Sequence, residues 1–242
     1  MKLCVVIPVY NHEHAIGSVV AALKKYALPC LLIDDGSSDE CAAALVQLAQ
    51  SSSVRLLRLP QNQGKGGAVI AGLKWAGELG FSHALQIDAD GQHDTCDVPR
   101  FIAAATQSPN TIISGQPVYD ASVPKVRLYG RYLTHVWVWI NTLSFTIKDS
   151  MCGFRVYPLA PTLALLQRIA IGRRMDFDTE ILVRLCWEGV PIQQLTTKVH
   201  YPLDGVSHFN AIKDNALISY MHAKLFLGML VRSPRLISRW FR

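Results

Sequence analysis

Two aspartates separated by one residue, Asp88 and Asp90, are the residues of this chain whose type and spacing most clearly indicate a chemical role. They follow an apolar run at 84–87 that has the character of a buried strand, and Gly91 and Gln92 come next. Side chains at positions i and i+2 of an extended chain point the same way, so both carboxylates could face one cation. Hard divalent ions such as Mg²⁺ and Mn²⁺ prefer oxygen ligands and take several from water and phosphate. The segment therefore predicts a metal that holds a diphosphate, with a plain acidic turn as the alternative.

Two further polar clusters follow predicted strands. Asp34 and Asp35 come at the end of the run 30–33, and Asn11 comes after the run Leu3–Val9. One carboxylate could accept hydrogen bonds from a ribose or a base, whereas a helix cap and a turn are the alternative. In parallel sheets, ligands bind beyond the carboxyl ends of the strands. The convergence of three polar clusters on that edge predicts an active site.

The segment 61–68 is rich in glycine and opens a predicted helix at 64–79. Backbone N–H groups at such a helix start suit an anion. The segment is not a P-loop, because no Ser or Thr follows Lys65 at the right spacing, and Val69 stands where a third dinucleotide-binding glycine belongs. Close packing of the helix on the sheet is the alternative role for the glycines. We expect both roles, with Lys65 as the ligand contact.

Charged residues in the second half supply further candidates. Arg127, Arg131 and Arg155 could grip phosphates, because a guanidinium fork matches phosphate oxygens. Each of them could instead be an ordinary solvated surface arginine. Asp149 and Arg155 flank the segment 151–154, which is expected to line the pocket.

Three acids, Asp176, Asp178 and Glu180, stand at the start of the predicted helix Phe177–Trp187. Acids in a first turn favour the helix dipole, which is the structural explanation for them. A helix needs one or two such acids, so one of the three could act as a general base or orient the acceptor.

The order of apolar and helical patterns predicts the fold class. Strands are expected at 3–9, 30–33, 54–59, 84–87 and 111–114, with helices at 11–26, 40–50, 64–79 and 98–106. The second half is less regular, with helices at 124–147, 177–187 and 211–231, a loop and short strand at 149–157, and an antiparallel strand at 191–201. This pattern indicates an α/β fold: a Rossmann-like, mostly parallel sheet with helices on both faces and a C-terminal helix.

Composition bounds the class of protein and its partners. The 242 residues are 50% hydrophobic and 17% charged, which suits one large α/β domain. The net charge of +6 favours nucleotide phosphates or anionic lipid headgroups; no basic stripe with interleaved aromatic residues suggests nucleic acid. No signal peptide or spanning helix is evident, so a cytoplasmic location is expected. The six cysteines lack a C-x-x-C pair and are expected to be reduced and mostly packed: Cys4, Cys30, Cys41, Cys96, Cys152 and Cys186.

The C-terminal segment 216–231 is strongly apolar, interrupted by His222 and Lys224, and a basic tail follows it. An apolar helix with a basic tail suggests an anionic membrane surface. A helix packed on the domain or in an oligomer interface is the alternative. We therefore expect a domain at 1–210 and a helical tail at 211–242, packed on that domain or lying peripherally on the inner face of the membrane.

Four motifs occur in a set order and together resemble family 2 glycosyltransferases of the GT-A fold. They are Val-Ile-Pro-Val-Tyr-Asn at 6–11, Ile-Asp-Asp-Gly-Ser-Ser-Asp at 33–39, Asn-Gln-Gly-Lys-Gly at 62–66 and Asp-Ala-Asp-Gly-Gln-His at 88–93. The resemblance is to the branch of dolichyl- and polyprenyl-phosphate sugar synthases, and Met-Cys-Gly-Phe-Arg at 151–155 is similar to a downstream segment of that branch. The match covers about residues 3–208.

The resemblance implies an inverting, Mg²⁺- or Mn²⁺-dependent transfer of a hexose from a nucleotide-diphosphate sugar to an acceptor such as polyprenyl phosphate. By position, the implied nucleotide-binding residues are Pro8, Tyr10, Asn11, Asp35, Lys65 and Asp88. The implied metal-binding residues are Asp88, Asp90 and Gln92, and the phosphate-binding residues are Arg127 and Arg131. The catalytic candidates are Asp90, Asp149, Asp178, Glu180 and Arg155, among which Asp149, Asp178 or Glu180 would be the base for a hydroxyl acceptor.

The chain differs from known glycosyltransferases of this kind in two ways, and two other functions are considered. Polyprenyl-phosphate enzymes often carry spanning helices after the catalytic domain, and none is evident here. The Leu-Ile-Ser-Arg-Trp at 236–240 lacks the Gln of processive synthases, so processive synthesis is not expected. A sugar-nucleotidyltransferase would have a glycine-rich N-terminal segment, which the stretch 8–11 is not. A non-catalytic nucleotide-binding protein would not need Asp88, Asp90 and Gln92 intact.

Overall fold

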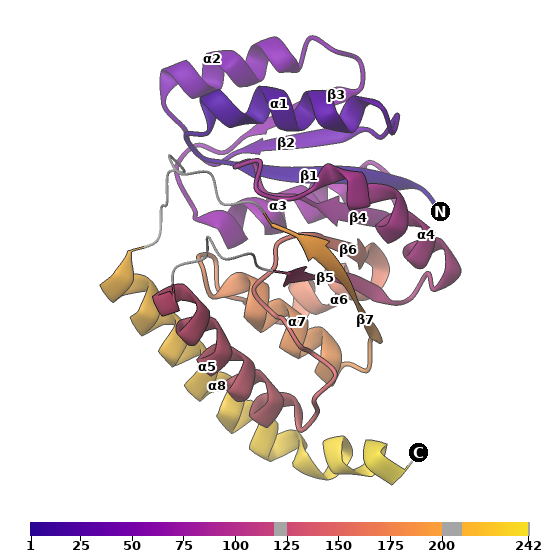
Figure 1. Ribbon diagram of the computed structural model, residues 1–242, viewed down its shortest axis with the longest axis vertical. Coiled ribbons are helices and arrows are strands. Elements are labelled where there is room, and N and C mark those ends of the chain that lie inside the picture. The colour runs from indigo at the N-terminus through magenta and orange to yellow at the C-terminus, as the bar shows by residue number, and fades with distance from the viewer. Residues whose placement is uncertain (119–124, 200–209, 242) are drawn as a thin grey trace.

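One mixed sheet organises the molecule. The computed structural model describes residues 1–118, 125–199 and 210–241, with side chains at 1–118, 130–199, 210 and 212–239. Within these residues, seven strands lie in the order β3-β2-β1-β4-β6-β5-β7 (Figure 1). The strand β6 runs antiparallel to both of its neighbours, and all other neighbouring pairs are parallel. The expected α/β class and mostly parallel sheet are confirmed.

The strands of the first half form where β-branched and aliphatic residues run together. In β1, Val5 and Ile7 pack on one side of the sheet while Cys4 and Val6 pack on the other, as the alternation of strand side chains requires. The strands are β1 (Leu3–Val9), β2 (Cys30–Asp34), β3 (Val54–Arg58), β4 (His83–Gln86), β5 (Ile112–Val118), β6 (Arg155–Pro158) and β7 (Ile192–Lys198).

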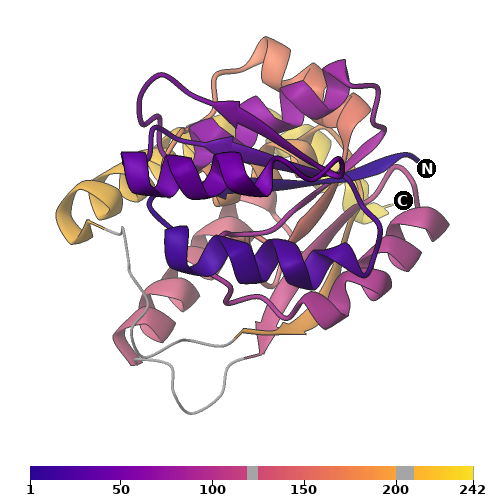
Figure 2. The ribbon, with the colours of Figure 1, turned by 90° about the horizontal axis from the view of Figure 1, so that it is seen from above.

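Helices cover both faces of the sheet (Figures 1 and 2). Apolar residues of α1, α2 and α4 share one hydrophobic cluster with the sheet, and those of α3, α6 and α7 share the other. The helices are α1 (Glu13–Lys24), α2 (Asp39–Leu48), α3 (Lys65–Glu78), α4 (Val98–Gln107), α5 (Lys125–Thr142), α6 (Leu159–Arg168), α7 (Phe177–Trp187) and α8 (Ala211–Ile237), with 3₁₀ turns at Thr95–Asp97 and Ser238–Phe241.

The second half differs from the expectation in strand direction. The strand expected at 191–201 is β7, and it runs parallel to β5, from Ile112 opposite Ile192 to Val118 opposite Lys198. The prediction of an antiparallel addition here was wrong, because the chain returns through α6 and α7 before β7 and so re-enters the sheet at the end where β5 begins. The antiparallel strand is β6, inserted between β4 and β5.

Helix boundaries also differ in this half. The helix α5 ends at Thr142 rather than at 147, because Leu143 adopts a positive φ of 48° that an α-helix does not allow. The helix α6 was not expected at all. The helix α8 continues to Ile237, well past the predicted end at 231.

The long helices α5 and α8 lie side by side along one flank of the molecule (Figure 1). On α8, Met221, Leu225 and Met229 are buried in the same cluster as residues of α3 and α7. The indole of Trp187 on α7 donates to the carbonyl of Asn141 on α5, so the three helices are tied together. The inward face of α8 is thus packed on the rest of the chain. No helix among the described residues is long and apolar enough to cross a membrane.

All six cysteines are free, as expected, and only Cys96 is exposed. Burial raises the pKa of the Cys4 and Cys152 thiols to about 12, so these thiols stay protonated and act as packing groups.

Candidate active site

Asp88 lies in a small cluster of charged side chains beyond the end of β4. The Lys65 ammonium is 2.9 Å from Asp88 Oδ2 and also 2.9 Å from Asp178 Oδ2. His93 Nε2 lies 3.4 Å from the same Asp88 oxygen. The other oxygen, Asp88 Oδ1, is buried and has no hydrogen-bond partner among the described residues. Asp88 therefore has one oxygen crowded by cationic groups and one oxygen left over.

Three separate elements bring these side chains together. Lys65 is the first residue of α3, Asp178 is in the first turn of α7, and Asp88 lies two residues past β4. Gln86, the last residue of β4, donates from Nε2 to Asp178 Oδ1 at 3.4 Å, which fixes α7 against the strand. Asp88 is therefore joined by Lys65 from the start of α3 and by Asp178 from far along the chain.

Charge decides the protonation states in this cluster. Burial opposes ionisation, but the Lys65 charge and His93 outweigh it and hold the pKa of Asp88 well below its usual range. Burial likewise works against the Lys65 ammonium, yet Asp178 and Asp88 raise the pKa of Lys65 above its ordinary value. Asp88 is an anion and Lys65 a cation at neutral pH.

Gly153 is packed directly on Asp88. A Cβ at position 153 would lie 2.6 Å from both Asp88 oxygens, closer than a Cβ atom comes to its non-bonded neighbours in proteins. The segment 149–153 therefore positions the Asp88 carboxylate by contact, and glycine is required there for space.

Asp90 and Gln92 form the turn that follows. Gly91 has φ of 73°, and Asp90 Oδ1 accepts a hydrogen bond from the backbone N–H of Gln92 at 3.0 Å. Both side chains are partly exposed. The structure thus keeps the residues predicted to bind metal on one short turn.

The donors present fit a hard divalent ion. No three His, Cys, Asp or Glu side chains of the described residues gather closely enough to hold an ion alone. Mg²⁺ is commonly held by one or two carboxylates with water and substrate phosphates completing its shell. A buried carboxylate oxygen without a partner, as in Asp88, is costly unless a cation or donor reaches it.

Asp35 holds the glycine-rich turn rather than standing free. Its carboxylate accepts from the N–H groups of Gln63 at 2.7 Å and Gly64 at 2.9 Å, and from the side-chain amide of Asn62 at 3.0 Å. The anion bound by these amides is therefore the chain's own Asp35. Burial raises the pKa of Asp35, although these hydrogen bonds oppose the rise.

The glycines of this turn serve close packing. The N–H of Gly67 donates to the carbonyl of Arg173 at 2.9 Å, and a Cβ on Gly64 would lie 2.6 Å from that same carbonyl oxygen. A Cβ on Gly66 would lie 2.3 Å from Phe177 Cβ. The start of α3 is thus pressed against the segment before α7, and this contact is what brings Lys65 to Asp178.

The end of β1 meets the end of β2. Asn11 Oδ1 accepts from the N–H of Ser38 at 2.8 Å, and its own N–H donates to Ser37 Oγ at 3.2 Å. Pro8 is buried in β1 opposite Ile33, whereas Tyr10 is partly exposed. Pro8, Tyr10 and Asn11 therefore stand with Asp35 at the same edge of the sheet.

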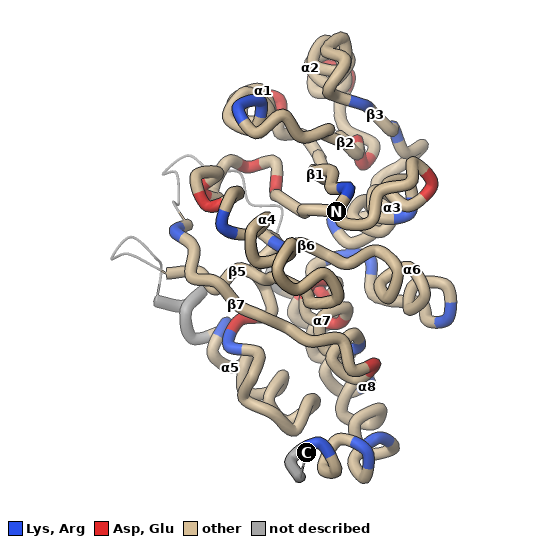
Figure 3. The backbone as a smooth tube through the Cα atoms, turned by 90° about the vertical axis from the view of Figure 1, so that its right-hand side faces the viewer, with Lys and Arg blue, Asp and Glu red and all other residues tan. Residues whose placement is uncertain are grey.

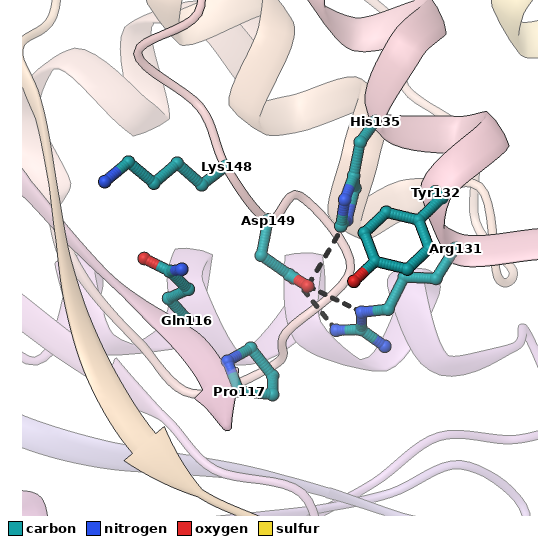
Figure 4. Close-up of a pocket in the computed structure, with 7 residues that line it drawn as sticks. All are labelled: Gln116, Pro117, Arg131, Tyr132, His135, Lys148 and Asp149. Atoms are coloured by element: carbon teal, nitrogen blue, oxygen red, sulfur yellow. Dashed lines mark hydrogen bonds and ion pairs between the residues drawn. The ribbon is translucent and has the colours of Figure 1, made fainter. Parts of the chain in front are cut away.

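Asp149 lines a pocket that is drawn in Figure 4. Arg131 donates to both of its oxygens, from Nε at 2.5 Å and from Nη2 at 2.9 Å, and His135 Nε2 is 3.4 Å away. The N–H groups of Met151 and Cys152 add two more hydrogen bonds at 2.9 Å. Although burial opposes ionisation, His135 and Arg131 hold the pKa of Asp149 well below its usual range. The cavity has a volume of about 120 Å³ and is lined by Gln116, Pro117, Arg131, Tyr132, His135, Lys148 and Asp149.

Arg155 is buried inside the protein. It is 0% exposed and donates to the carbonyls of Asp178 and Ser150 at 2.6 Å each and to Ser114 Oγ at 3.2 Å. These contacts tie the start of α7 to β5 and to the segment after Asp149. Arg155 therefore holds the frame of the site and does not face a ligand.

Glu180 and Asp176 are also directed away from Asp88. Glu180 is 1% exposed and accepts from the N–H of Gly172, with Arg184 and Lys224 as ionic partners. Asp176 Oδ1 accepts from the N–H of Arg174. Of the three predicted acids, only Asp178 joins the Asp88 cluster. Arg127 lies on α5 at a position whose side chain is outside the described residues.

Two residues beside Asp88 and Asp149 were not assigned a role from sequence. His93 contacts Asp88, and His135 contacts Asp149. His135 stands four residues after Arg131, so helical spacing predicts that both face the same side and could have flagged it. His93 is part of the motif at 88–93, but nothing in its spacing indicated a bond to Asp88.

Comparisons with known proteins show the family to which this chain belongs. A model of the family described as Glycosyl transferase family 2 matches residues 4–173. An undecaprenyl-phosphate mannosyltransferase of Micrococcus luteus is 33% identical over 207 residues, covering 81% of this chain and 82% of that protein. A UDP-N-acetylglucosamine–dolichyl-phosphate N-acetylglucosaminyltransferase of Methanococcus voltae is 26% identical, covering 80% and 85%.

A solved structure supports the fold. Glucosyl-3-phosphoglycerate synthase from Mycobacterium tuberculosis, in complex with Mn²⁺, UDP and phosphoglyceric acid, superposes with a TM-score of 0.68 at 15% identity, covering 94% of this chain and 78% of that one. The resemblance inferred from the sequence motifs is confirmed. The chain belongs to glycosyl transferase family 2, has the GT-A type of fold, and is a glycosyltransferase similar to the polyprenyl-phosphate sugar synthases.

Proposed function

We propose that this enzyme transfers a hexose from a nucleotide-diphosphate sugar to a lipid-linked phosphate such as polyprenyl phosphate, with inversion at the sugar. One observation carries the proposal most directly. At the edge where β1, β2 and β4 end, Asp88 has a lysine ammonium beside one carboxylate oxygen and, on the other, buried oxygen, no partner among the residues that the structure describes. That combination suits a divalent cation and the diphosphate of a sugar donor.

Asp88, Asp90 and Gln92 would hold Mg²⁺ or Mn²⁺ at this edge. When bound, such an ion stabilises the negative charge that develops on the leaving nucleoside diphosphate. Lys65 would add positive charge to the same diphosphate, because its ammonium already lies beside Asp88. Because Asp90 would contact this ion, we also propose it as a catalytic residue.

Pro8, Tyr10, Asn11 and Asp35 would line the nucleotide end of the donor site. The Asn11–Ser38 and Asp35–Gly64 hydrogen bonds fix the backbone around it. Because Asp35 is already engaged by three donors, its main contribution is to hold the turn at 62–64 in place for the nucleotide.

The pocket around Asp149 would receive the acceptor phosphate. Arg131, Lys148 and His135 supply positive or polar groups there, and Asp149 neutralises part of that charge.

A phosphate oxygen of the acceptor would attack the anomeric carbon as the bond to the diphosphate breaks. The acceptor phosphate is already ionised, so the step needs no proton transfer. Direct displacement of this kind inverts the anomeric centre.

Asp149 is a poor general base, because Arg131 and His135 stabilise its anion. Glu180 is occupied by Gly172, Arg184 and Lys224. For an acceptor with a hydroxyl nucleophile, Asp178 would be the base, since it alone of the three reaches the Asp88 cluster.

We further propose that the tail 211–242 and α5 rest on an anionic membrane surface at its cytoplasmic face. Large apolar side chains are exposed on α5 at Leu133 and Val136 and on α8 at Leu227 and Val231. The sequences of α5 and α8 contain one acid, Asp214, which is buried. Basic residues stand in the last turn of α8, at Arg235, and in the 3₁₀ turn after it, at Arg239 (Figure 3). An apolar face edged by positive charge matches anionic lipid.

Sedimentation with vesicles tests this surface. We expect binding to vesicles containing phosphatidylglycerol, and loss of binding in the L227E/V231E double variant, with V46E on α2 as a control that charges a remote exposed valine. Equal binding by both variants would contradict the proposal, and a change of oligomeric state instead would indicate that a second copy covers this face.

An assay of the products tests the transfer. The protein is incubated with UDP-, GDP- or TDP-hexoses and a short polyprenyl phosphate, with Mn²⁺ or with a chelator. We expect nucleoside diphosphate and glycosylated lipid to form together, in the presence of metal only. Release of pyrophosphate would favour a sugar-nucleotidyltransferase, and nucleotide binding without turnover would favour a non-catalytic protein.

A further inference from the structure

Lys65 occupies a cation position between two carboxylates. Its ammonium is 2.9 Å from Asp88 Oδ2 and 2.9 Å from Asp178 Oδ2, and its side chain is 21% exposed. The same Asp88 carboxylate carries the unpartnered oxygen that fits a metal. One carboxylate therefore has a resident cation on one oxygen, while its other, buried oxygen lacks a hydrogen-bond partner among the described residues.

We propose that Lys65 is a place-holding cation that competes with the divalent metal for Asp88 and is released toward the donor diphosphate when metal and donor bind. The inference rests on the proposed function, because it takes Asp88 as a metal ligand. It adds a positioning role for Lys65 and Asp178 that couples metal binding to donor binding.

Electrostatics makes the competition unavoidable. Two cations on one carboxylate repel each other, so an ammonium in contact with Asp88 weakens the attraction of that carboxylate for a metal. The four-carbon stem of lysine lets the ammonium move without moving α3. Asp178 gives Lys65 a second partner, so Lys65 need not become an unpaired buried charge when it leaves Asp88.

The alternative is an ordinary structural ion pair. Asp149 shows what such a carboxylate looks like in this protein, because both of its oxygens accept hydrogen bonds from Arg131 and Oδ1 also from backbone N–H groups. Asp88 Oδ1, by contrast, accepts no hydrogen bond from the described residues. Its geometry suits a carboxylate that is held for a later partner.

Mn²⁺ binding without any nucleotide, followed by electron paramagnetic resonance, tests the proposal. In Lys65→Met, removal of the competing cation is expected to tighten Mn²⁺ binding by about tenfold or more. Lys74→Met on the same helix is the matched control; it removes the same charge from an exposed position, and its affinity should match the wild type. Asp178→Asn should weaken Mn²⁺ binding, because displaced Lys65 then loses its second partner.

A readout of stability guards against misfolding. Because a ligand that binds only the folded state raises apparent stability, Mn²⁺ should raise the melting temperature of Lys65→Met more than that of the wild type. Unchanged or weaker Mn²⁺ binding in folded Lys65→Met would overturn the inference. Mn²⁺ binding that is unaffected by Asp88→Asn would instead show that the proposed metal site itself is wrong.

Discussion

Asp88 and Asp149 are two aspartates beside cations, yet their surroundings differ in kind. Asp149 is 3% exposed and accepts hydrogen bonds from an arginine and two backbone N–H groups, with a histidine close by. Asp88 is 20% exposed at its side chain and keeps one oxygen without a partner among the described residues. We infer that the fully hydrogen-bonded carboxylate of Asp149 stabilises the fold, whereas the incompletely bonded carboxylate of Asp88 would gain a partner by binding a cation. The difference separates a structural anion from a binding anion.

The two carboxylates are nevertheless linked. The segment that begins at Asp149 ends at Gly153, which lies against Asp88. Arg155 fixes the same segment through the carbonyl of Ser150. The segment from Asp149 to Gly153 therefore supports the Asp88 carboxylate.

The largest expected effect comes from the turn beside Asp88. Asp90→Asn removes a charge proposed to hold the metal and should lower turnover on the order of 10³-fold, the size seen when charge stabilisation of a transition state is lost. Asp94→Asn is the control, because Asn can replace Asp as the cap that accepts from the N–H of Cys96. Comparable steady-state rates for the Asp90 and Asp94 variants would contradict the proposal that Asp90 binds the metal.

Removing the arginine that holds Asp149 should cost stability, in addition to any loss of acceptor binding in this pocket. Arg131→Met leaves Asp149 buried with its strongest partner gone, so the free energy of unfolding should fall by about 3 kcal/mol. Urea denaturation measures the change. Arg168→Met, at an exposed ion pair with Glu188, should change it by less than about 1 kcal/mol. A loss for Arg131→Met no larger than that of Arg168→Met would mean that Asp149 does not depend on its arginine.

The contact between the regions can be broken separately. Gly153→Ala would place a Cβ 2.6 Å from the Asp88 oxygens and displace the carboxylate. A shift of this size should lower turnover on the order of 10²-fold, because catalytic groups must be placed to within about 1 Å. Gly17→Ala, where a Cβ meets nothing within 4 Å, is the control. Wild-type rates in Gly153→Ala would show that Asp88 is not positioned through this segment.

His222 extends the comparison to a buried group that forms no ion pair with the described part of the chain. It is 5% exposed on α8, its Nε2 has no partner among the described residues, and burial lowers its pKa to about 4. Because the unfolded chain binds the proton more tightly, stability is present above the unfolded pKa and is lost as the pH falls toward the folded pKa. From pH 7 to pH 4.5, the wild type should therefore lose about 2 kcal/mol more than His222→Gln.

Urea denaturation at both pH values measures this difference. His14→Gln replaces a histidine whose side chain is 91% exposed and should follow the wild type at both values. If the wild type and His222→Gln lose the same free energy of unfolding between these pH values, burial between α5 and α8 does not lower the pKa of His222.

The sequence predicted the first half of the fold better than the second for a physical reason. The strands β1 to β4 are short aliphatic runs separated by amphipathic helices, so local pattern and parallel topology agree. The direction of β7 depends on its pairing with β5, far away in the chain, and no local pattern reports such pairing. The helix α6, which carries Pro161 in its first turn, was likewise missed.

The candidate site shows the same limit. The positions of Asp88, Asp90 and Asn11 followed from strand ends, which sequence reveals. The bond from Lys65 to Asp178 and the burial of Arg155 follow from how α3 packs on α7, which depends on contacts such as that of Gly66 with Phe177. Whether a charged residue faces a ligand or the interior is decided by such packing.

The most direct test of the central claim is the anomalous scattering of Mn²⁺ in crystals grown with a nucleoside diphosphate. The proposed metal site predicts a Mn²⁺ peak beside Asp88 and Asp90, and none in the pocket of Asp149. A peak at Asp149, or a nucleoside diphosphate bound with Mn²⁺ away from Asp88, would contradict it.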